Sequence, residues 1–138
     1  MAPTPHEIEK VADSEKITIN LGFVDLGRID LMVSEGFYSN RTDFIRMAIR
    51  NQLERHTDVV SKSLLRNGLD LGLRHFTRHE LEAAVNANQS LQIHVLGLAS
   101  IAQDVSPELA RAAIASIRVL GAFHASPAVK TALADRTG

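Results

Sequence analysis

Apolar and polar side chains alternate from Glu15 to Phe23, in the stretch EKITINLGF. One side of this alternation carries Ile17, Ile19 and Leu21, and the other carries Lys16, Thr18 and Asn20. Strict alternation is typical of a half-buried β-strand. No second strand pattern lies within hairpin distance, so the sequence predicts a strand that finds no partner nearby in its own chain.

Two helical patterns follow this strand. The first spans Val24–Gly36 and ends on a glycine, which suits a helix C-terminus; its apolar face consists of Leu26, Ile29, Met32 and Val33. The second begins at Ser39 or Asn40, either of which is a good N-cap, with Asp43 in the first turn, where the helix dipole favours negative charge. Its apolar positions are Phe44, Ile45, Ala48, Ile49 and Leu53. The patterns predict a strand–helix–helix module that ends near His56.

A lone amphipathic strand can bury its apolar side if two chains pair their strands antiparallel across a two-fold axis. Four helices would then cover one face of the two-stranded ribbon. The other face would present Lys16, Thr18 and Asn20 from both chains. The major groove of B-DNA admits such a ribbon, and lysine, hydroxyl and amide groups read base edges there.

The region from Lys16 to about His56 resembles the ribbon-helix-helix family of DNA-binding regulators, of the Arc/MetJ/CopG type. The resemblance rests on KITINL, on RID (Arg28–Asp30) and on EGFYSNRTDFIRMAIRNQLE (Glu35–Glu54). The last run is similar to the family block GxYxxRxxFIRxAIR and matches it at Gly36, Tyr38, Arg41, Phe44, Ile45, Arg46, Ala48, Ile49 and Arg50. The chain departs from the usual pattern in LGFVDLG, which replaces the common proline–acidic start of the first helix.

The resemblance implies an obligate homodimer that binds double-stranded DNA through an intermolecular β-ribbon. The implied base contacts come from Lys16, Thr18 and Asn20. The implied phosphate contacts come from the start of the second helix, at Ser39, Asn40 and Arg41. A helix N-terminus suits this role on physical grounds too, because it offers free N–H groups and a positive dipole end to an anion.

A Leu-Gly dipeptide recurs in the second half of the chain, about every 24 residues, which is typical of repeat proteins. The copies are Leu71-Gly72, Leu96-Gly97 and Leu120-Gly121. The last two lie in the strand-like segments QIHVLG (Gln92–Gly97) and SIRVLG (Ser116–Gly121), which follow alanine-rich helical segments at Glu80–Val85 and Glu108–Ile114. Helix N-caps are expected at Thr77, Ser106 and Ser126. The pattern predicts a small α/β solenoid whose units must stack to bury their apolar faces.

We therefore expect an α+β protein in three parts. Residues 1–14 form a flexible N-terminal arm, residues 15–57 form the ribbon-helix-helix domain, and residues 58–138 form the solenoid-like repeat region. The repeats are expected to join dimers into higher oligomers or to bind another partner, which would increase avidity for adjacent DNA half-sites.

The function that these patterns favour is sequence-specific regulation of transcription, most simply as a repressor. One alternative is an antitoxin that regulates its own toxin–antitoxin pair, with the repeat region binding the toxin. Another is a dimeric scaffold in which the ribbon module only dimerises and does not bind DNA.

Composition limits the kinds of site and the cellular location that are expected. The 138 residues carry a net charge of −1, so overall basicity gives no indication of nucleic-acid binding. There are no cysteines, which excludes disulfides and thiolate metal sites. The first ten residues lack the apolar core of a signal peptide, and no apolar run approaches the length of a membrane span, so we expect a cytoplasmic protein without membrane contact.

Candidate metal and catalytic residues are scattered along the chain. The histidines considered as ligands were His75, His79, His94 and His124. They fall on different predicted elements, His124 in a loop, and no acidic cluster completes a set, so we expect no metal and no other cofactor. No phosphate-binding glycine loop or nucleophile–base arrangement is present either, and enzyme activity is not expected.

Overall fold

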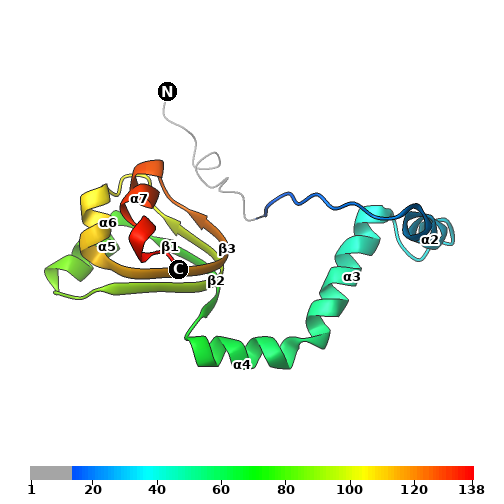
Figure 1. The fold of residues 1–138 in the computed structure, drawn as a ribbon, viewed down its shortest axis with the longest axis horizontal. Coiled ribbons are helices and arrows are strands. Elements are labelled where there is room, and N and C mark those ends of the chain that lie inside the picture. Colours follow the sequence, from blue (N-terminus) through cyan, green and yellow to red (C-terminus); the bar gives the residue numbers. More distant parts are fainter. Residues whose placement is uncertain (1–13) are drawn as a thin grey trace. The chain divides into compact units, whose positions relative to one another are not determined.

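The computed structural model describes residues 14–138 and forms two compact units, one that ends at Val60 and one that spans Ser61–Gly138. The expected N-terminal arm lies outside the described residues except for Ser14. The first unit contains α2 (Phe23–Ser34) and α3 (Arg41–Arg55), and α4 (Thr57–Asn67) begins in it (Figure 1). The mixture of helices and strands confirms the α+β class.

Helix α2 ends as the sequence predicts, at a glycine. The N–H of Gly36 donates to the carbonyl of Val33, and the N–H of Phe37 donates to the carbonyl of Met32, each at 3.0 Å. These are the two bonds of a Schellman motif, which requires a left-handed residue at its centre. Gly36 has a φ of 86° and supplies that conformation without strain.

The predicted strand at the start of the first unit is not paired within one chain. Residues 15–22 belong to no helix or strand, and all of them are exposed. Figure 1 shows this segment running as an extended stretch into α2. Strand pairing here needs a second chain, so the ribbon stays a prediction.

No helix was predicted from the sequence between His56 and the first repeat, where the structure has α4. Its apolar residues are largely exposed, with Val59 at 65% and Leu65 at 86%. No residue of α4 is fully buried. Val60 and Leu64 are half-buried and lie four residues apart, so α4 has a short apolar face that was not recognised from the sequence.

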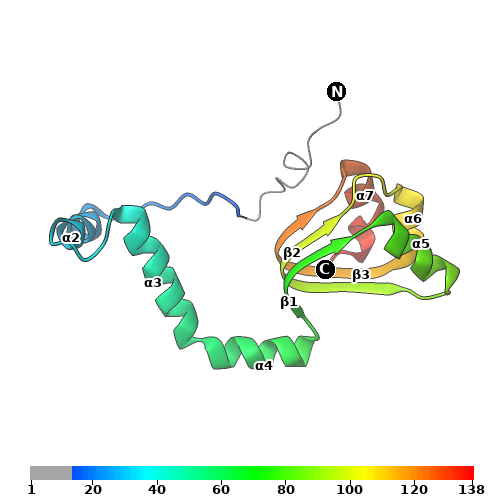
Figure 2. The same ribbon diagram turned by 180° about the vertical axis from the view of Figure 1, so that it is seen from behind.

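The second unit is a three-stranded parallel sheet with helices on one face. Its strands, in the order β1-β2-β3, are β1 (Asp70–Phe76), β2 (Leu91–Ile101) and β3 (Ile114–His124). Its helices are α5 (Arg78–Asn86), α6 (Pro107–Ala113), α7 (Pro127–Ala132) and the short 3-10 helix η1 (Ala134–Arg136). Figures 1 and 2 show α5, α6 and α7 together on the same side of the curved sheet.

The predicted helix caps are confirmed in this unit. The side chains of Thr77, Ser106 and Ser126 accept hydrogen bonds from the backbone N–H groups three residues ahead, at 3.1 to 3.2 Å. Each bond satisfies one of the donors that a helix N-terminus leaves free. The repeat therefore begins each helix in the same way.

The Leu-Gly dipeptides lie side by side across the sheet. Gly72 pairs with Gly97, and Gly97 pairs with Gly121. All three glycines have positive φ values, of 122°, 139° and 123°. A Cβ on Gly97 would overlap the carbonyl oxygen of Gly72, and a Cβ on Gly121 would overlap that of Gly97. Only glycine fits the second and third positions of this ladder.

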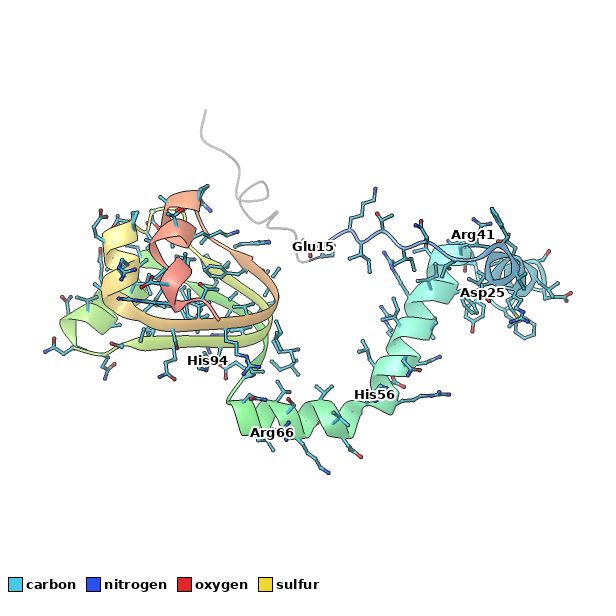
Figure 3. The ribbon with its side chains drawn as sticks, in the orientation of Figure 1. Glu15, Asp25, Arg41, His56, Arg66 and His94 are labelled. Carbon is cyan, nitrogen blue, oxygen red and sulfur yellow. The ribbon has the colours of Figure 1, made fainter. Side chains whose placement is uncertain are left out.

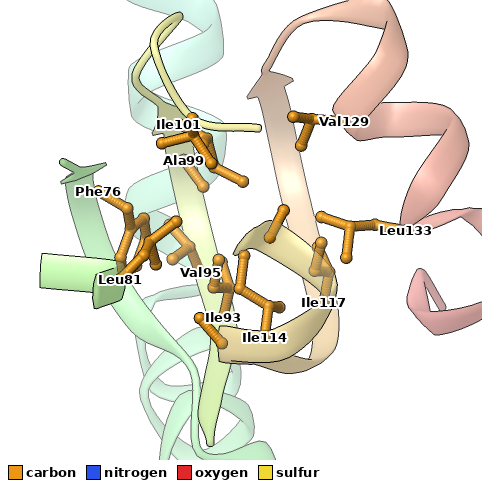
Figure 4. Close-up of a cluster of buried hydrophobic side chains, with 13 residues drawn as sticks. Phe76, Leu81, Ile93, Val95, Ala99, Ile101, Ile114, Ile117, Val129 and Leu133 are labelled. Carbon is orange, nitrogen blue, oxygen red and sulfur yellow. The ribbon is translucent and has the colours of Figure 1, made fainter. Parts of the chain in front are cut away.

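The core of the second unit lies between the sheet and its helices (Figure 4). Ile93, Val95 and Ala99 of β2 alternate toward it, and Leu81 of α5 and Leu133 after α7 are fully buried there. The alternation is what a sheet covered on one face requires.

Three sequence expectations for this unit were wrong in detail. Strands β2 and β3 continue past their Leu-Gly dipeptides, because a glycine of positive φ stays in the ladder instead of ending it. Ile114 was assigned to a helix but is the first residue of β3. His124, expected in a loop, is the last residue of the same strand.

The chain folds back over the end of the repeat. Thr137 forms a parallel bridge with Ile117, and the N–H of Gly138 donates to the Ile117 carbonyl at 2.9 Å. Arg111 of α6 donates to the Asp135 carboxylate at 2.8 Å. These polar contacts cover the outer edge of β3, the last strand of the repeat.

Candidate nucleic-acid interface

The residues expected to contact bases lie in the extended segment 15–22. Lys16, Thr18 and Asn20 are all exposed. Ile19 and Leu21 of the same segment line a hollow of about 470 Å³ together with Ile29 of α2 and Phe44, Ile45, Ala48 and Ile49 of α3. The polar residues Asp25, Arg28 and Gln52 also line it. Neither Thr18 nor Asn20 is among the lining residues. Two of the three apolar residues of the pattern, Ile19 and Leu21, therefore line the hollow, whereas Ile17 does not.

The apolar residues of the first unit are mostly uncovered in one chain. Ile29 is the one buried hydrophobic residue among residues 14–60. Ile17 and Ile19 are 71% and 57% exposed, and the predicted α3 stripe is open too, with Ile49 at 46% and Leu53 at 61%. A unit with so little buried apolar area has no core of its own.

The start of α3 is fixed by reciprocal side-chain bonds. Asn40 is the N-cap, and its Oδ1 accepts from the N–H of Asp43 at 2.8 Å. The Asp43 Oδ2 accepts from the N–H of Ser39 at 2.9 Å. Of the two N-caps considered, Asn40 is the one used, while Ser39 contributes its backbone.

Arg41 is held by a carboxylate of the other helix. Its Nε and Nη2 donate to Oδ1 and Oδ2 of Asp30, both at 2.8 Å, so the pair is bidentate. Figure 3 labels Arg41 where α3 begins, beside α2. The guanidinium hydrogen bonds lower the pKa of the Asp30 carboxyl, and the carboxylate raises the pKa of Arg41.

Sequence reasoning placed Arg41 at a phosphate and assigned no role to Asp30. Asp30 belongs to the RID motif of the first helix, but the motif does not indicate which basic side chain pairs with Asp30. The partner is 11 residues away, across the turn between the helices. Only the packing of α2 on α3 brings the two together.

Two backbone donors remain open at the α3 N-terminus. Among the described residues, the N–H groups of Arg41 and Thr42 have no hydrogen-bond acceptor, whereas those of Ser39 and Asp43 do. The preceding turn is fixed by Tyr38, whose ring meets that of Phe44 edge-on with centroids 4.9 Å apart. The helix therefore presents an ordered pair of N–H groups that an anion can accept from.

The histidines considered as metal ligands lie apart or pair with serines. His75 Nδ1 is 2.7 Å from the Ser100 hydroxyl, and His94 Nε2 is 3.0 Å from the Ser116 hydroxyl. No group of three or more metal-ligating side chains occurs within residues 14–138. Over the same residues, no helix has the length and apolar character to span a bilayer.

One comparison with known proteins gives a match. The sequence model of the family described as "Ribbon-Helix-Helix transcriptional regulator family" matches residues 12–130. The matched range includes α2 and α3 and continues through the parallel sheet into α7. No curated protein and no solved structure matches the chain.

Proposed function

The chain belongs to the ribbon-helix-helix transcriptional regulator family, and we propose that it acts in the cytoplasm as a homodimeric repressor that reads DNA with a two-stranded ribbon. Regulators of this family bind DNA and dimerise, and they are generally not enzymes. The proposal concerns how this chain would do so: which residues pair, which face the bases and which hold the phosphates.

The observation that carries the proposal is the open apolar side of the first unit. Ile19 and Leu21 line a hollow with the apolar faces of α2 and α3, and only Ile29 is buried among residues 14–60. A second copy would fill this hollow and add the missing strand, so that residues 16–21 of two chains pair antiparallel. Burial of several isoleucine and leucine side chains, at about 1.5–3 kcal/mol each, is the driving force for such pairing.

The outward residues of the ribbon would read the bases. Lys16, Thr18 and Asn20 are exposed and lie outside the hollow lined by their apolar neighbours. Lysine can contact guanine, asparagine can make paired bonds to adenine, and threonine can contact either base edges or a thymine methyl. With six positions per dimer and only Lys16 charged, sequence reading would depend on hydrogen bonds more than on net charge.

The start of α3 would hold the DNA backbone through its amides. The N–H groups of Arg41 and Thr42 are free to donate to a phosphate, and the side chains of Ser39 and Asn40 lie beside them with donors to spare. The Arg41 guanidinium is engaged with Asp30, so we assign it a positioning role, with any phosphate contact left to its remaining amino group.

The second unit would act as an assembly region. Its three β–α units stack in register and bury one continuous core, which fits a minimal solenoid. The family match extends through this unit, so the repeats belong to the regulator and are not an unrelated addition.

Fluorescence anisotropy of the full chain against its own promoter region and a scrambled DNA tests the proposal. We expect preferential binding to the promoter, and Asn20→Ala should weaken it by at least about 30-fold, because each dimer loses two base contacts of about 1–3 kcal/mol each. Asn86→Ala, an exposed asparagine at the end of α5, is the matched control and should bind as the native chain does.

Two results would contradict it. Binding that is equal for both DNAs and unchanged by Asn20→Ala would mean that the ribbon does not read sequence. No binding even at low salt would favour the scaffold, in which the module only dimerises. A reporter fused to the promoter would separate repression from activation.

A further inference from the structure

The sheet of the second unit has a bare face opposite its helices. The residues that alternate away from the core form three rows across the strands: Leu71, Leu96 and Leu120; then Leu73, Leu98 and Ala122; then His75, Ser100 and His124. We call the first two rows the leucine face. Leu71 and Leu73 are 70% and 68% exposed, Leu120 is 49% exposed, and the other members are half-buried.

Parallel sheets rarely leave a face in water. Their connecting helices usually cover both sides, and nearly all of them are buried on both. Here α5, α6 and α7 lie on one side only, in both views of the fold (Figures 1 and 2). A contiguous patch of leucines on the other side is the kind of surface that soluble chains reserve for a partner.

We propose that the leucine face of one chain packs against the leucine face of a second copy of this chain. This inference rests on the assembly role proposed for the repeats and names the surface that performs it.

The chemistry of the face fits its own copy better than a charged partner. The leucine face itself has no ionisable side chain. Its polar neighbours are His75, Ser100 and His124 at one end and His94 and Arg118 at the other, and Arg118 donates to the Asn67 side chain at 3.4 Å. Two identical faces can therefore meet without burying an unpaired charge, which a nucleic acid or an acidic peptide could not do here.

The size of the face also favours a tethered copy. With strands about 4.8 Å apart and a rise of about 3.3 Å per residue, it covers on the order of 200 Å² per chain. Two such faces bury about 400 Å², well below the roughly 1,200 Å² of a stable interface between free proteins. Dimerisation, which ribbon-helix-helix regulators share, supplies the missing stability, because it raises the local concentration of the second face to about the millimolar range.

A single introduced cysteine tests the contact in the full chain, since the native sequence has none. Leu98 lies on the central strand at the middle of the face, so a two-fold axis through the face would bring Leu98 of both copies together. Leu98→Cys treated with a bismaleimide that spans about 10 Å, the spacing of packed sheets, should give a covalent dimer. Ala83→Cys, exposed on α5 in the helix layer, is the control and should remain mostly uncrosslinked.

A second substitution tests whether cross-linking depends on the leucine face itself. Leu71→Lys, added to Leu98→Cys, changes an exposed position of the face and should lower the cross-linked fraction about tenfold, because a lysine would have to be buried without a partner. Circular dichroism should show that both variants keep the native fold. Equal cross-linking of Leu98→Cys and Ala83→Cys, or no effect of Leu71→Lys, would overturn the proposal.

Promoter binding measured on the same samples separates this inference from the proposed function. If Leu98→Cys without any other substitution binds its promoter but does not cross-link, only the leucine-face contact is removed. Cross-linking that persists in a chain without DNA binding removes the regulator proposal and keeps the contact.

Discussion

Arg41 and Asp30 form a bidentate ion pair that joins the start of α3 to the middle of α2, with both hydrogen bonds at 2.8 Å. Within the first unit, this pair and the contacts of Ile29 are what orients the two helices before a second chain is present. The pair is exposed, so water and salt weaken it. It sets geometry more than it adds stability.

Asp30→Asn should therefore loosen the module in a way that depends on pH and salt. Pairing lowers the pKa of the Asp30 carboxyl below its ordinary 3.8, so its stabilising contribution is complete above that pH and is lost as the pH falls through the lowered value. We expect the thermal midpoint of Asp30→Asn to lie below that of the native chain at pH 7 and low salt. The gap should close below the lowered pKa and shrink in about 1 M salt.

Asp70→Asn in β1 is the control, because it lies in the second unit and its exposed ion pair with Arg74 is longer, at 3.6 Å. A gap that is the same size for both variants, or that does not respond to salt, would contradict a specific role for the Asp30–Arg41 pair.

The N-cap of α3 predicts a difference between two neighbouring residues. Asn40→Ala removes the side chain that accepts from the N–H of Asp43 and should destabilise the dimer by about 1 kcal/mol per chain. Ser39→Ala keeps the backbone N–H that donates to Asp43 and should change stability little. Urea unfolding at a fixed protein concentration measures both, and equal losses would mean that Asn40 is not the working cap.

The glycine ladder predicts an order of sensitivity. Gly97→Ala places a Cβ against the carbonyl oxygen of Gly72, and we expect a loss of at least about 3 kcal/mol, enough to unfold the second unit in many conditions. Gly72→Ala meets no atom within 4 Å and should cost only the strain of its positive φ, about 1–3 kcal/mol. Urea midpoints followed by circular dichroism rank the two variants. If Gly72→Ala were the more destabilising, the close approach of Gly97 to the Gly72 carbonyl would not be what requires glycine.

Because side chains alternate in the segment 15–22, lysine substitutions at two adjacent positions should have opposite effects on the dimer. Ile19→Lys replaces an apolar side chain of the hollow by a charged one and should convert dimers into monomers, because burying an ammonium among Ile29, Phe44 and Ile45 is costly. Thr18→Lys adds the same charge on the exposed side and should leave the dimer intact. Sedimentation velocity over a range of protein concentrations distinguishes them. If Thr18→Lys dissociated the chains and Ile19→Lys did not, the assignment of the two sides would be reversed.

The features that the sequence predicted well depend on neighbours within a few residues. Asn40, Thr77, Ser106 and Ser126 each cap the helix that follows, and Gly36 ends α2, because a cap bond involves only residues up to five positions apart. The Leu-Gly repeat also indicated the sheet, since identical segments stack in identical surroundings.

The features that it missed depend on contacts between distant segments. The engagement of Arg41 by Asp30 follows from how α2 packs on α3, and composition does not indicate it. The full length of β2 and β3 follows from glycines that adopt positive φ inside a ladder, where the sequence alone suggests a break. Helix α4 has only a short apolar face, at Val60 and Leu64, and was not recognised from the sequence.

The register of the parallel sheet has a consequence for how fast the chain folds. Each strand pairs with one that lies about 25 residues away, so the second unit closes two loops of similar length within a single chain. Its refolding rate should be independent of protein concentration. The first unit buries little until it meets another chain, so its rate should rise with concentration. One polypeptide thus contains a unimolecular and a bimolecular folding step, and the slower of the two changes as the protein accumulates.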